Sequence, residues 1–175
     1  MGQVLGGLLV KGVISEGSNM KIGPMKDGSF KNVTIKSIHR NRVPCRIVRA
    51  GQGAALCLNV NLTDLRNGMV LISRNSKSSG CWYFQANISV LFHETAIYQG
   101  FETTVHIGSI RQTAIIFAIF AAKCIQTDDR ASVLFKFKKY PEHVSVGQRL
   151  LFRSGASKGI GEITQIFPIN CNSTG

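Results

Sequence analysis

Cationic side chains crowd one short stretch of the sequence, between residues 39 and 49. The stretch holds His39, Arg40, Arg42, Arg46 and Arg49. No acidic residue stands between Asp27 and Asp64 to neutralise them. Each arginine offers a forked set of donors that fits a phosphate, and each neutralised phosphate releases counterions. The stretch therefore predicts an RNA surface that contacts phosphates, and an ordinary solvated face is the alternative interpretation.

A second basic group lies on one predicted strand near residue 136. Val133, Phe135 and Phe137 alternate with Lys136 and Lys138, which is the pattern of a half-buried antiparallel strand. With the neighbouring Lys139, these lysines form a secondary basic face. They predict either a further RNA contact or the plain outer face of a strand.

The positive charge is concentrated in the first half of the chain. The net charge of the 175 residues is +12. Residues 1–80 hold 12 Lys and Arg against three acids, which gives +9, whereas residues 81–175 hold nine against six, which gives +3. A nucleic-acid partner is therefore expected mainly for the first half.

Residue patterns for enzymatic chemistry are absent from the sequence. A P-loop needs a Gly-Lys pair followed by Ser or Thr, and no Gly-Lys dipeptide occurs in the 175 residues. The glycines from Gly155 to Gly161 are similar to a dinucleotide-binding fingerprint, yet the alternation of Ile163, Gln165 and Phe167 after them predicts a strand and not the required helix. We therefore predict a tight hairpin there, no catalytic residue and no cofactor for this chain.

The cysteines indicate neither a metal site nor a disulfide framework. They form an odd set without Cys-x-x-Cys spacing: Cys45, Cys57, Cys81, Cys124 and Cys171. We expect reduced, structural thiols in a cytoplasmic protein without metal.

The longest apolar run, residues 114–122, is shorter than the roughly 20 residues of a membrane helix and predicts a buried strand. No membrane partner is expected.

Short apolar stretches broken by Gly, Asn and Ser predict an all-β fold. Val33 and Ile35 alternate with polar residues, but Ile38 breaks the phase near Ser37, which predicts a β-bulge or a barrel corner. Seven polar residues followed by a glycine form the predicted linker, residues 73–80.

We place one small antiparallel barrel at residues 1–80, a second at 81–170 and a tail at 171–175. Trp82 and Tyr83 are expected to cap a barrel end, with base stacking as the alternative.

Several segments resemble the second and third domains of translation GTPases of the elongation factor Tu type. In the first half they are residues 12–17, 23–24, 33–40, 50–56 and the strand Leu65-Arg66-Asn67-Gly68-Met69-Val70-Leu71. In the second half they are residues 84–88, 108–114, 140–142 and 147–153. The segment 108–114 is similar to the branch that holds GTP-binding protein 1 and GTP-binding protein 2.

The resemblance implies two successive β-barrels, as in domains two and three of elongation factor Tu. It implies contacts with tRNA or ribosomal RNA and the ribosome, no DNA specificity, and coupling to a GTPase domain outside this chain that would bind GTP and Mg. It also implies a further strand before Gly2. Where elongation factor Tu uses a glutamate and a phenylalanine near the tRNA end, this chain has Ser37 and His39, and only Arg40 carries over. The alternative function is a free-standing basic module for RNA or protein binding that acts without GTP.

Overall fold

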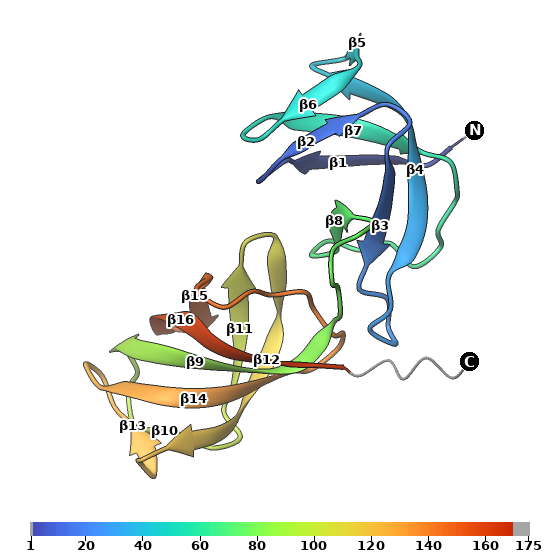
Figure 1. Ribbon diagram of the computed structural model, residues 1–175. Coiled ribbons are helices and arrows are strands. Elements are labelled where there is room, and N and C mark those ends of the chain that lie inside the picture. Colours follow the sequence, from blue (N-terminus) through green and yellow to red (C-terminus); the bar gives the residue numbers. More distant parts are fainter. Residues whose placement is uncertain (1, 170–175) are drawn as a thin grey trace, which may run out of the picture. The chain divides into compact units, whose positions relative to one another are not determined.

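The computed structural model describes residues 2–169, and strands carry its architecture throughout (Figure 1). No α-helix occurs between residues 2 and 169, so the all-β prediction is confirmed. The described chain accordingly has no helix with the length and apolar character needed to cross a membrane. Cys171, the predicted tail 171–175 and residue 170 lie outside the described residues.

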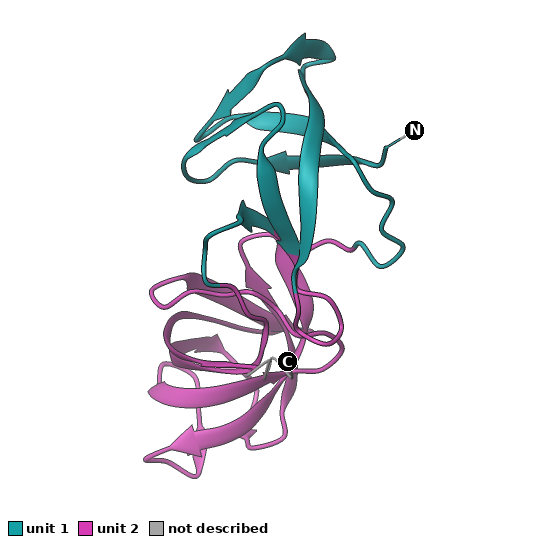
Figure 2. Cartoon of the chain, turned by 45° about the vertical axis from the view of Figure 1, so that its right-hand side comes forward, with its two compact units in different colours: residues 1–22, 30–65, 71–77 teal, residues 23–29, 66–70, 78–175 magenta. Residues whose placement is uncertain are grey.

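The chain divides into two compact units whose segments alternate along the sequence (Figure 2). Unit 1 comprises residues 1–22, 30–65 and 71–77. Unit 2 comprises residues 23–29, 66–70 and 78–175. Two short segments that precede residue 73 in the sequence therefore pack with unit 2. These units group residues by contacts, and the family-domain boundary after residue 80 stays a prediction.

An antiparallel sheet organises unit 1. The first eight strands are β1 (Val4–Leu8), β2 (Val13–Ser15), β3 (Asn19–Gly23), β4 (Lys31–Arg40), β5 (Val43–Cys45), β6 (Ile47–Arg49), β7 (Gly53–Leu58) and β8 (Val70–Ser73). The sheet runs in the order β1-β7-β4-β3-β8, β5 pairs with β4, and β2 pairs with β6. The register between β4 and β7 shifts between Ile35 and Ser37, which confirms the predicted bulge.

Unit 2 is a closed antiparallel barrel. Its strands are β9 (Cys81–Phe92), β10 (Ile97–Tyr98), β11 (Glu102–Ile107), β12 (Ile110–Phe120), β13 (Cys124–Ile125), β14 (Arg130–Phe137), β15 (Arg149–Ser154) and β16 (Ser157–Pro168). The barrel closes in the order β11-β12-β14-β9-β16-β15, while β10 pairs with β13. Phe84 is fully buried in its core, with its ring centroid 5.2 Å from that of Phe135 and 5.0 Å from that of Phe137. Closure removes exposed strand edges from these six strands.

The prediction of a buried strand at residues 114–122 needs correction. Residues 114–122 do not form a uniformly buried strand, because Phe117 is 46% and Phe120 is 43% exposed. Strand β12 ends at Phe120, and Ala121 adopts a left-handed φ of 61°. Phe92, the last residue of β9, is likewise 41% exposed, although Ile88 and Val90 of the same strand are buried. Hydrophobicity alone did not distinguish the inward from the outward positions of β12, whose pairing with β14 shifts between Ile116 and Ala118.

The glycine-rich segment near residue 155 serves a hairpin, as predicted. Gly155 has a φ of 60° in the turn between β15 and β16. A Cβ atom at Gly159 would overlap the ring of Phe152, and one at Gly161 would stand 2.7 Å from the backbone oxygen of Asn87. These two glycines therefore allow β16 to lie close against the aromatic core and the neighbouring strand.

Candidate nucleic-acid interface

The β4–β5 hairpin presents Arg42 at its tip. Arg40 pairs with Val43 across the hairpin, so Asn41 and Arg42 form the two-residue loop. Their φ angles are 49° and 66°. A two-residue loop with both residues at positive φ is the type I′ arrangement, which favours Asn followed by Gly. The loop thus exposes an arginine at a position where glycine would relieve backbone strain.

Arg46 and Arg49 follow on the same path, at a corner of unit 1. Strand β5 pairs with β4, whereas β6 pairs with β2, and Arg46 stands at the junction. Arg49 lies opposite Val13 in the β2–β6 ribbon. Both arginines are exposed. The change of partner between β5 and β6 therefore places Arg46 between two sheets of unit 1 and Arg49 on the second of them.

The structure separates His39 from Arg40. Successive residues of a strand point to opposite faces, and Ile38 is fully buried. His39 is accordingly exposed, while Arg40 is half-buried with an Nε atom that has no hydrogen-bond partner within the described part of the chain. Four of the five predicted residues are thus available at the surface, and Arg40 contributes less accessible charge than the sequence suggests.

The three predicted lysines have different surroundings on unit 2. Lys136 Nζ lies 5.6 Å from the centroid of the Tyr83 ring. Lys138 Nζ donates to Glu102 Oε2 at 2.9 Å, and both side chains are about half exposed. The backbone N–H of Lys139 donates to Gln112 Oε1 at 2.9 Å, and the residue is exposed. The structure therefore does not give these three lysines a common role. The exposed ion pair of Lys138 with Glu102 offsets part of the group's positive charge.

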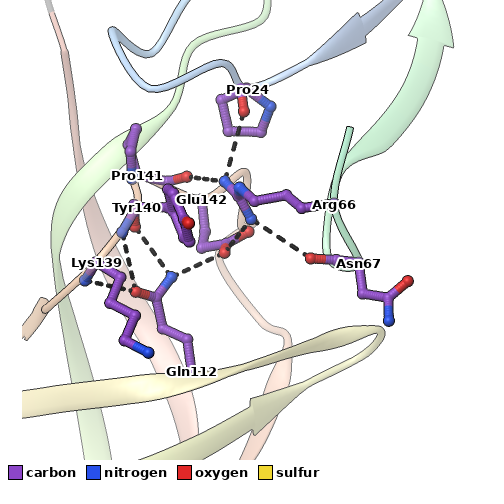
Figure 3. A network of polar contacts seen from close by, with 8 residues as sticks. All are labelled: Pro24, Arg66, Asn67, Gln112, Lys139, Tyr140, Pro141 and Glu142. Carbon is purple, nitrogen blue, oxygen red and sulfur yellow. Dashed lines mark hydrogen bonds and ion pairs between the residues drawn. The ribbon is translucent and has the colours of Figure 1, made fainter. Parts of the chain in front are cut away.

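A buried polar network in unit 2 was not foreseen from the sequence (Figure 3). Arg66 Nη1 donates to Glu142 Oε1 at 2.6 Å, and Arg66 Nη2 donates to the carbonyl oxygen of Pro141 at 2.7 Å. The Arg66 guanidinium also lies 4.5 Å from the centroid of the Tyr140 ring. Gln112 Nε2 donates to Glu142 Oε1 at 2.8 Å. Arg66 and Glu142 stand 76 residues apart, so local sequence patterns carry no signal of their contact.

Burial controls the ionisation of this network. Glu142 is 1% exposed, and its burial raises the pKa of the carboxyl group, while Arg66 and Gln112 act to lower it. Glu142 Oε2 has no hydrogen-bond partner among the described residues. Burial and the nearby Glu142 charge raise the pKa of the Cys81 thiol to about 12, so Cys81 stays protonated and unreactive. The network is suited to holding segment 66–70 within unit 2.

Residues 2–169 contain no cluster of three or more His, Cys, Asp or Glu side chains that could hold a metal ion. The four cysteines in this range, Cys45, Cys57, Cys81 and Cys124, are free thiols. Tyr83, the third residue of β9, stands on the outer side of that strand, opposite Lys136 of β14. Trp82 packs against the barrel core.

Comparison with known proteins gives two findings. Residues 2–72 match elongation factor Tu domain 2. The chain is 44% identical to GTP-binding protein 2 of Mus musculus and of Homo sapiens over 167 residues, which is 95% of this chain and 28% of each relative. It is 40% identical to GTP-binding protein 1 of Xenopus laevis over 167 residues, 95% of this chain and 25% of the relative. The chain thus spans about a quarter of the length of these relatives.

Proposed function

Because the chain belongs to the elongation factor Tu type of translation GTPases, in the branch of GTP-binding proteins 1 and 2, we propose that it is a non-catalytic RNA-contacting part of such a protein. Its partners are tRNA or ribosomal RNA in the cytoplasm. GTP hydrolysis belongs to a GTPase domain outside this chain, to which the barrels couple.

One observation carries this proposal: the exposed arginines of unit 1 have no acidic neighbours in sequence. Arg42, Arg46 and Arg49 are exposed on one continuous path from β4 to β6. The ion pairs found between residues 2 and 169 are Arg66–Glu142 and Lys138–Glu102, and neither involves these arginines. Exposed guanidinium groups without carboxylate partners retain their donors for phosphate.

Salt dependence tests the proposal directly. Fluorescence anisotropy would follow binding of labelled tRNA to the chain between about 50 and 200 mM salt. Replacing Arg40, Arg42, Arg46 and Arg49 by Gln should flatten the plot of log affinity against log salt by up to about four counterions. The matched control replaces Lys136, Lys138 and Lys139 by Gln and should change the slope by no more than about one. Equal losses in both variants would indicate diffuse attraction and would refute a specific arginine surface.

A protein-binding module is the second candidate function. Two aliphatic side chains on the same path as the arginines, Val43 and Ile47, are 62% and 46% exposed. Phosphate contact has no need of exposed aliphatic groups, whereas a protein interface buries them. Replacing Val43 and Ile47 by Thr should leave tRNA affinity unchanged if RNA is the partner. Loss of binding to a protein partner in that variant, together with no tRNA binding by the parent chain, would favour this second function.

A further inference from the structure

An aromatic surface stands on the outside of the unit 2 barrel. On β9 the alternate residues Phe84, Ala86 and Ile88 are buried, so Tyr83 points away from the core. Tyr83 pairs with Lys136 on β14 and with Phe167 on β16. These three side chains therefore form one row across three adjacent strands.

Two β-bulges determine which aromatic residues reach this face. The pairing of β12 with β14 shifts between Ile116 and Ala118, so Phe117 is the extra residue of a bulge and turns outward. The pairing of β16 with β9 shifts between Ile163 and Gln165. Before that shift Ile163 faces the core, and after it Ile166 does, so the neighbouring Phe167 faces outward.

The resulting group, which we term the stacking platform, consists of Tyr83, Phe117, Phe167 and Lys136. The Tyr83 and Phe117 ring centroids are 5.2 Å apart with an interplanar angle of 81°. Lys136 Nζ lies 5.6 Å from the Tyr83 centroid. Phe117 is 46% and Phe167 is 40% exposed. The platform thus combines accessible ring surface with one ammonium group.

Charge favours a nucleic acid over a protein as the occupant. The ion pairs within residues 2–169 leave Lys136 without a carboxylate partner, so its charge complements a phosphate. Unpaired bases stack on aromatic side chains while neighbouring cations contact the backbone, and this combination is typical of proteins that bind single strands. A duplex keeps its bases paired and offers no such stacking surface.

We propose that the stacking platform binds unpaired bases of single-stranded RNA. The Tyr83 and Phe117 rings contact the bases, and Lys136 contacts a backbone phosphate. The platform lies on unit 2, whereas the arginines belong to unit 1, and it adds recognition of single strands to the general attraction for phosphate. The inference stands whether or not the arginine surface binds tRNA.

Short labelled RNA tests the platform. The probes are an oligoadenylate of about ten nucleotides, within the usual span of single-strand sites, and an abasic oligomer of equal length. Tyr83→Leu and Phe117→Leu, each retaining apolar volume, should weaken oligoadenylate binding by about tenfold. Binding of the abasic oligomer should not change. Tyr98→Leu is the matched control, since Tyr98 is 60% exposed on β10 outside the platform.

Folding and charge are checked in the same experiment. Near-unchanged circular dichroism of each variant shows that the barrel is intact, and Trp82, the single tryptophan of the chain, reports the environment beside Tyr83. If a ring variant fails to fold, Lys136→Gln keeps the rings and should flatten the salt dependence of oligoadenylate binding by about one counterion. Unchanged affinity in the ring variants, or an equal loss for Tyr98→Leu, overturns the proposal and leaves the rings as a protein contact.

Discussion

At the residue scale, two arginines show how differently the chain uses the same side chain. Arg42 is exposed at the tip of a hairpin in a left-handed conformation. Arg66 is 15% exposed and shares hydrogen bonds with Glu142 and Pro141. The first is available to a partner, whereas the second stabilises the arrangement of its own unit. The strained backbone of Arg42 identifies it as a functional candidate, because packing does not explain a left-handed conformation at an exposed residue.

Replacing Arg42 by glycine should stabilise the protein and weaken RNA binding. Glycine adopts a φ near 66° without the steric penalty of a side chain, so the free energy of unfolding should rise by about 1 kcal/mol. Urea unfolding measures the stability and tRNA anisotropy measures the affinity. Arg46→Gly is the matched control: it removes a cation where no positive φ exists, and it should lower stability. A stability loss in the Arg42 variant would contradict the assignment of strain.

Replacing Glu142 by glutamine should change how stability depends on pH. Burial raises the native pKa of Glu142 above its ordinary value of 4.5, so its favourable contribution is present below that pH and is lost as pH rises through the native pKa. Glutamine does not titrate. The variant should therefore gain stability relative to the parent chain as pH rises from about 4 towards neutrality.

Thermal unfolding of both proteins across this pH range measures the effect. Glu102→Gln provides the control, because the Glu102 side chain is 48% exposed and pairs with Lys138 at the surface. That variant should show no comparable trend. A variant of Glu142 that loses stability relative to the parent as pH rises would mean that pairing with Arg66 outweighs burial.

At the scale of elements, bulges and strand glycines decide how β16 and β12 present their side chains. The shift after Ile163 places Ile166 against the core and Phe167 outside it. Gly159 and Gly161 leave room for Phe152 and for the backbone of β9. The segment that is similar to a nucleotide fingerprint is therefore explained by strand packing.

Gly159→Ala tests this packing. Its added methyl group would meet the buried ring of Phe152 and approach the carbonyl oxygen of Ser89 to 2.8 Å, so the free energy of unfolding should fall by about 1–3 kcal/mol. Gly7→Ala in β1 is the matched control, because no atom lies within 4 Å of the place that its Cβ would occupy. The control should be neutral or slightly stabilising. Equal effects in denaturant unfolding would show that space in β16 is not limiting.

At the scale of the whole molecule, the two units differ in charge and in closure. Unit 2 forms a closed barrel around one hydrophobic core of aliphatic and phenylalanine side chains. In unit 1 the sheet path ends at β1 and β8, and most of the positive charge lies in the first 80 residues. The proposed RNA contacts are correspondingly of two kinds, phosphate contact in unit 1 and base stacking in unit 2.

The chain should bind neither GTP nor GDP. No Gly-Lys pair exists in the sequence to contact the β- and γ-phosphates, although the relatives are GTP-binding proteins. A fluorescent guanine nucleotide titrated with micromolar protein should give no saturable signal. A full-length relative serves as the positive control. Saturable micromolar binding by this chain would contradict the prediction.

The sequence by itself determined the all-β class, the break in phase within β4 and the inward residues of β14, because period-two alternation reports directly which face of a strand is buried. It also identified the family segments and the arginines between residues 39 and 49. Only the tertiary structure decided the pairing of Arg66 with Glu142, the left-handed position of Arg42 and the outward turn of Phe117. Each of these depends on strand register or on contacts between distant segments, and neither leaves a local periodic signal in the chain.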